Sequence, residues 1–144
     1  MCETEATTQL VWLDAYMNSS IFHRLFSDVL PTVSVTLVTE NPNEAPTSKN
    51  MRRFNELLDI SRLFAQERPD TYSLVVHNPK VLHDRWAVFD SKRIFYLGGS
   101  AKDACDKSYF TVSTVEATPV NLSCIANHVS SGTEYFGRTQ TTHS

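Results

Sequence analysis

The spacing of hydrophobic residues along the chain alternates between strand-like runs and helical faces. Short apolar or β-branched runs predict strands, and apolar residues that recur every three to four positions predict helices. In the first half, strands and helices are expected in turn over residues 10–14, 21–30, 33–38, 49–66 and 71–76. Because a helix between two strands favours a parallel pair, this half predicts a parallel sheet with helices packed on it.

The second half has shorter connections between its apolar runs. Strands are expected at 84–89, 93–97 and 109–114, followed by a last helix that starts at Pro119 and ends before Gly132. Short connections suit antiparallel neighbours, so these strands should complete a mixed sheet in which strand 84–89 is central. The predicted fold class is α/β, with one mixed β-sheet flanked by helices.

Length, charge and cysteine content indicate the number of domains and the cellular compartment. The 144 residues suit one domain, expected over 1–132, with the Thr-rich residues 133–144 as a flexible tail. The net charge is −3, so any contact with nucleic acid would have to be local. Three cysteines without paired spacing, and no apolar run of secretion-signal or membrane length, predict a cytoplasmic protein without membrane insertion.

The most informative polar motif is Leu-His-Asp-Arg-Trp-Ala-Val-Phe-Asp, which ends at Asp90. On one strand His83 and Arg85 would point the same way, because alternate side chains share a face. A Gly-Gly turn later in the chain could return Ser100 and Lys102 to the same place. An imidazole, a hydroxyl and two cations around one point form a pocket suited to phosphate.

These residues resemble the signature of the phospholipase D superfamily, which is His-x-Lys-x4-Asp followed by Gly-Ser-x-Asn. The positions that match it are His83, Arg85, Asp90, Gly99 and Ser100. Arg85 replaces the usual lysine and Lys102 replaces the usual asparagine, a His-Asp-Arg variant that looks like a nuclease-like branch. Asp14 lies in a segment similar to the first-strand Asp-Pro-Tyr element of such proteins.

The resemblance implies a metal-independent phosphodiesterase, in the first place a nuclease, that needs no cofactor. His83 would form a phosphohistidine, and the same histidine of a second copy would protonate the leaving oxygen. Since one chain holds one such motif, the resemblance implies a homodimer acting on nucleic acid or another phosphodiester. The implied catalytic residues are His83, Arg85, Asp90, Ser100 and Lys102, with Arg85, Gly99, Ser100 and Lys102 binding phosphate.

Each candidate also has a structural interpretation. His83 could be a half-buried strand histidine and Arg85 a solvated surface charge. Asp90 could be a turn cap and Lys102 an exposed loop lysine. Asp14 is either a buried polar residue bonded to its neighbours or a carboxylate in the wall of the site. A local basic rim could be formed by Arg52, Arg53, Lys92 and Arg93, although paired charges on helix and turn surfaces are the usual explanation.

A rival function also fits the sequence. The chain could be a non-catalytic module that binds phosphate or nucleic acid, regulatory or defence-related, in which the Arg85 and Lys102 exchanges mark lost chemistry. The acidic net charge favours this alternative, because a nuclease usually presents a basic groove.

Overall fold

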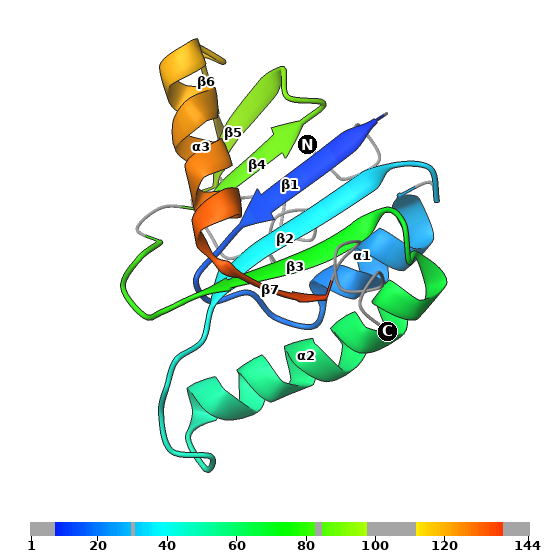
Figure 1. The fold of residues 1–144 in the computed structure, drawn as a ribbon, viewed down its shortest axis with the longest axis vertical. Coiled ribbons are helices and arrows are strands. Elements are labelled where there is room, and N and C mark those ends of the chain that lie inside the picture. The colour runs from blue at the N-terminus through cyan, green and yellow to red at the C-terminus, as the bar shows by residue number, and fades with distance from the viewer. Residues whose placement is uncertain (1–7, 30, 83–84, 98–111, 137–144) are drawn as a thin grey trace.

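One mixed sheet organises the described part of the chain, which comprises residues 8–29, 31–82, 85–97 and 112–136 of a computed structural model (Figure 1). Its strands follow the order β6-β5-β4-β1-β2-β3-β7. In chain order the elements are β1 (Gln9–Leu13), α1 (Ile21–Asp28), β2 (Ser34–Glu40), α2 (Lys49–Glu67), β3 (Tyr72–His77), β4 (Trp86–Phe89), β5 (Arg93–Leu97), β6 (Val112–Val115), α3 (Pro119–Ser131) and β7 (Thr133–Phe136).

Parallel and antiparallel pairs divide the sheet as the connection lengths predict. β1 pairs with β2 and β2 with β3 in parallel, each pair being joined through a helix. The pairs β1–β4, β4–β5, β5–β6 and β3–β7 are antiparallel. The predicted α/β class with a mixed sheet flanked by helices is confirmed. β1 occupies the middle position, and β4 lies beside it rather than at the centre.

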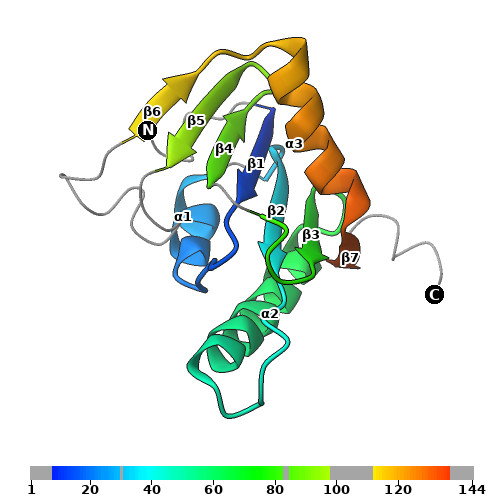
Figure 2. The same ribbon diagram turned by 90° about the vertical axis from the view of Figure 1, so that its left-hand side faces the viewer.

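Helices cover both faces of the sheet, α1 and α2 on one and α3 on the other (Figure 2). The larger core lies under α1 and α2, and the smaller one lies under α3, which buries Ile125. β1 serves both cores, since Leu10 and Trp12 belong to the first and Val11 and Leu13 to the second. A strand covered on both faces reads as a continuous apolar run, as this one does.

Local chemistry sets the helix boundaries. The Ser48 hydroxyl accepts the N–H of Met51 at 3.0 Å and caps α2, whose first residue follows directly. Thr118 caps α3 in the same way, with Pro119 in the first turn. In the described residues, no helix is both long enough and apolar enough to cross a bilayer.

The expected flexible tail at 133–144 is wrong for its first four residues. Residues 133–136 form β7, which pairs with β3 and extends the sheet. The Tyr135 ring packs edge-on against Phe54 of α2, with ring centroids 6.3 Å apart, so apolar burial holds this strand. The domain therefore continues past the predicted boundary at 132, and residues 137–144 lie outside the described residues.

The strand expected at 84–89 is shorter than predicted. β4 starts at Trp86, and Arg85 comes directly before it. Within β4, Ala87 and Phe89 enter the core under α1 and α2, while Val88 enters the core under α3. Arg85 thus lies directly before the buried strand β4, beside the end of β1.

Candidate functional site

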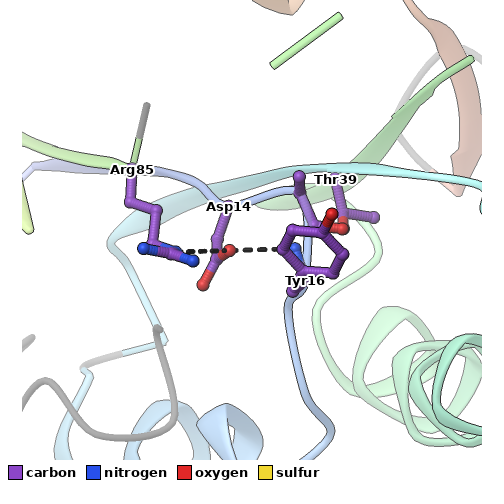
Figure 3. Close-up of polar contacts among 5 residues, drawn as sticks. Asp14, Tyr16, Thr39 and Arg85 are labelled. Carbon is purple, nitrogen blue, oxygen red and sulfur yellow. Dashed lines mark hydrogen bonds and ion pairs between the residues drawn. The ribbon is translucent and has the colours of Figure 1, made fainter. Parts of the chain in front are cut away.

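An ion pair joins the ends of β1 and β4. Leu13 is the last residue of β1 and pairs with Trp86, the first residue of β4. The next residues outward are Asp14 and Arg85, and Arg85 Nε donates to Asp14 Oδ1 at 3.3 Å (Figure 3). The Asp14 side chain is fully buried, whereas 36% of the Arg85 side chain is exposed. Asp14 therefore holds Arg85 at this end of the sheet, with part of the Arg85 side chain open to solvent.

The loop that leads to Arg85 is fixed by another carboxylate. Glu40 is the last residue of β2 and is buried. Its side chain accepts backbone N–H groups from Lys80, Val81 and Leu82. Hydrogen bonds to a charged acceptor are stronger than neutral ones, so Glu40 anchors residues 80–82 directly before the 83–85 segment.

Arg53 of α2 supplies another cation near Asp14. Its guanidinium carbon lies 5.2 Å from the centre of the Tyr16 ring, and its Nη1 donates to Asn50 Oδ1 at 3.1 Å. Burial lowers the pKa of Arg53, and the nearby Asp14, Tyr16 and Glu44 act in the opposite direction. Arginine remains charged at neutral pH under such a shift. Arg53 is half-buried and packs on the Tyr16 ring, so it is not an ordinary exposed surface charge.

Tyr16, Glu40 and Arg53 border a hollow at the carboxyl ends of the parallel strands. Its volume is about 570 Å³, and its lining includes Tyr16, Glu44, Asn50, Arg53, Lys80 and Leu82. Ligands of open α/β sheets bind at this edge, outside the carboxyl ends of the strands. The described part of the chain holds no group of three or more His, Cys, Asp or Glu side chains that could bind a metal ion.

Asp90 lies at the opposite end of β4 from Arg85. Its Oδ1 accepts the Thr8 N–H at 2.7 Å, the Thr8 hydroxyl at 3.0 Å and the Gln9 N–H at 3.0 Å. Four strand residues separate Asp90 from Arg85, a distance of about 16 Å along the strand. The structure does not bring these two motif residues together, and the bonds of Asp90 hold the start of β1.

Other residues of the predicted site cannot be placed. His83, Gly99, Ser100 and Lys102 lie outside the described residues, so their convergence on Arg85 stays a prediction. Asp14, by contrast, is described: its side chain is buried and accepts from Arg85, a motif residue, while a role in the wall of the site stays a prediction.

Sequence reasoning noted Tyr16 only as part of the segment similar to Asp-Pro-Tyr, without a function of its own, and it missed Glu40. The contact between Tyr16 and Arg53 could not be predicted, because Arg53 is distant in the sequence and reaches Tyr16 only through the packing of α2. Glu40 could have been suspected, because a carboxylate that ends a buried strand requires a partner.

Comparisons with known proteins bear on the fold. No family model matches the chain, and no curated protein matches it. Among solved structures, the chain is similar to Nuc from Salmonella typhimurium, a phospholipase D family member. The TM-score is 0.58 at 14% sequence identity, with 94% of this chain and 87% of Nuc covered. At this identity the likeness shows the fold, so the chain has the α/β fold of a phospholipase D family member.

Proposed function

We propose that this protein is a metal-independent phosphodiesterase that cleaves nucleic acid through a covalent intermediate on His83. The observation that carries the proposal is the Arg85–Asp14 pair, which presents a cation at the ligand-binding edge two residues after His83. The fold shared with a phospholipase D family member supports the same function. Arginine binds nonbridging phosphate oxygens through its planar set of donors, which Arg85 would do here.

The proposed reaction has two steps. A neutral His83 nitrogen attacks phosphorus, the bond to the leaving oxygen breaks, and His83 of a second subunit donates a proton to that oxygen. Water then attacks the phosphohistidine, the phosphorus–nitrogen bond breaks, and the second His83 takes the proton from water. The products are an alcohol and a phosphomonoester, and a homodimer supplies both histidines.

The remaining motif residues take supporting roles in this proposal. Backbone N–H groups at Gly99, the Ser100 hydroxyl and the Lys102 ammonium would bind phosphate oxygens beside Arg85. Asp90 would act at a distance, because its carboxylate holds the far end of the Arg85 strand.

Hydrolysis in EDTA tests the mechanism. The substrates are single- and double-stranded DNA and RNA and bis(nitrophenyl) phosphate, with wild type compared with His83→Ala. We expect turnover by wild type and none above background by the variant. His23→Ala, an exposed histidine on α1, is the matched control and should retain wild-type activity. A need for a divalent metal, or full activity in His83→Ala, would remove the mechanism.

A non-catalytic binding module is the second candidate, and one observation favours it. Asp14 already accepts from Arg85, so its carboxylate competes with phosphate for the cation, and the chain is acidic overall. Under this alternative neither Arg85→Lys nor wild type turns over substrate, while Arg85→Ala loses phosphate affinity. In a working site, Arg85→Lys should reduce turnover and weaken binding only modestly.

A further inference from the structure

We propose that the hollow lined by Tyr16, Arg53 and Lys80 binds one nucleobase of a single-stranded nucleic acid, stacked on Tyr16. The inference rests on the proposed function, because it places a phosphodiester of the same strand at Arg85. It adds the substrate class, since a base that is paired in a duplex cannot leave its stack to enter the hollow without loss of pairing.

Tyr16 is built as a stacking platform. Tyr16 is 54% exposed, although it lies three positions after a buried strand. The Arg53 guanidinium lies 5.2 Å from the ring centre, so Tyr16 packs on a cation and still offers surface to a ligand. Aromatic rings in nucleic-acid clefts bind any base in this way, because every base has a π-face.

The turn that carries Tyr16 is held in place from several sides. Asp14 N–H donates to the Val38 carbonyl at 3.0 Å, and the Thr39 hydroxyl donates to the Ala15 carbonyl at 3.4 Å. The Tyr16 N–H donates to Asp14 Oδ1 at 2.9 Å, the same oxygen that binds Arg85. Figure 3 shows Arg85 and Tyr16 on opposite sides of the Asp14 carboxylate. Asp14 therefore fixes the positions of both the Arg85 cation and the backbone of Tyr16.

The charges of the hollow favour a neutral polar ligand. Glu40 and Glu44 balance Arg53 and Lys80, so the lining is not a second phosphate site. Glu40 is occupied by backbone N–H groups, whereas Glu44 is bonded to the Asn50 amide at 3.1 Å on the wall of the hollow. A carboxylate and an amide offer both acceptors and donors, which matches the edge of a nucleobase.

Arg53 also has an unused donor. Its Nε is buried and has no hydrogen-bond partner in the described residues. A buried donor without a partner costs free energy, which a site recovers when a ligand acceptor reaches it. A base carbonyl or ring nitrogen would reach this donor only with a movement of the Arg53 side chain, because the Nε atom is buried.

The test compares binding of two single strands of equal length in EDTA, one intact and one in which the bases are replaced by abasic residues. Fluorescence anisotropy should show wild type binding the intact strand about tenfold more tightly. Tyr16→Ala should lose that tenfold difference and keep its affinity for the abasic strand, and Tyr16→Phe should retain wild-type binding. Tyr96→Ala, an exposed tyrosine on β5, is the matched control and should behave as wild type.

Equal affinity of wild type for both strands, or for neither, would overturn the inference, as would an equal loss on both strands in Tyr16→Ala. The result is separable from the proposed function because binding is measured without turnover. A base-dependent difference without hydrolysis would reject the phosphodiesterase and keep the base site. Hydrolysis that depends on His83 without a base-dependent difference would do the reverse.

Discussion

At the scale of residues, the candidate site depends on one buried carboxylate with three functions. Asp14 accepts from Arg85 and from the backbone of Tyr16, and its charge also acts on Arg53. Burying a carboxylate is costly unless it is paired and hydrogen-bonded, and these contacts supply that compensation. Asp14 therefore sets both the position of the cation and how strongly that cation attracts an external anion.

We expect Asp14→Asn to bind a short single-stranded oligonucleotide several-fold more tightly than wild type. The substitution removes the charge that competes with phosphate for Arg85 and leaves an acceptor for the Tyr16 N–H. Hydrolysis should fall, because a neutral amide oxygen orients Arg85 less strongly than the carboxylate does. The measurement is affinity at two salt concentrations.

Asp70→Asn is the matched control for this prediction, since it makes the same charge change in the exposed turn between α2 and β3. Its affinity should rise only slightly and its hydrolysis should not change. If the two variants bind equally well, the effect comes from net charge and Asp14 has no special role.

At the scale of elements, the anchored loop before Arg85 connects stability with the site. Glu40→Gln keeps an oxygen acceptor but removes the charge that binds three backbone N–H groups. We expect a loss of about 1–3 kcal/mol in the free energy of unfolding, measured with denaturant. Turnover should fall as well, because the loop leads directly into residues 83–85.

Glu56→Gln, at an exposed position of α2, is the control for charge alone and should stay within about 0.5 kcal/mol of wild type. A Glu40→Gln protein as stable as wild type would show that these hydrogen bonds do not hold the loop.

The junction between α3 and β7 depends on a glycine for close approach. A Cβ at Gly132 would lie 2.5 Å from Val75 Cγ1 and 3.0 Å from His77 Nε2, both in β3. We expect Gly132→Ala to reduce the free energy of unfolding by about 1–3 kcal/mol, through displacement of β7 from β3. Thermal unfolding of the variant, beside Ser131→Ala as control, measures this, and an unchanged melting temperature would contradict the close approach.

The same junction shows where prediction from sequence fails. The pattern identified the strands and helices up to Ser131 because each has a clear period or a capping residue. β7 is only Thr-Glu-Tyr-Phe after a glycine that reads as a helix end, and it becomes a strand through its pairing with β3. Arg53 was ambiguous for a similar reason, since its contact with Tyr16 depends on how α2 packs over the sheet.

At the scale of the whole molecule, the proposed mechanism requires two copies of the chain. We expect light scattering to give about 33 kDa, twice the 16.3 kDa of one chain. His83→Cys should form a disulfide-linked dimer under mild oxidation, because the two copies of residue 83 would face each other across a twofold axis. His23→Cys, on α1, is the control and should not cross-link. A mass of about 16 kDa at every concentration would contradict the shared site.

The hydrogen bonds at the two ends of β4 constrain the number of residues between Arg85 and Asp90. Arg85 is hydrogen-bonded to Asp14, directly after the end of β1. Asp90 is hydrogen-bonded to Thr8 and Gln9, at the start of β1. The four residues between Arg85 and Asp90 therefore form the strand that pairs with β1 in register. One inserted residue between them would break one tie or move the intervening side chains to opposite faces of the sheet. The spacing between Arg85 and Asp90 thus fixes the length of β4, the strand that positions Arg85.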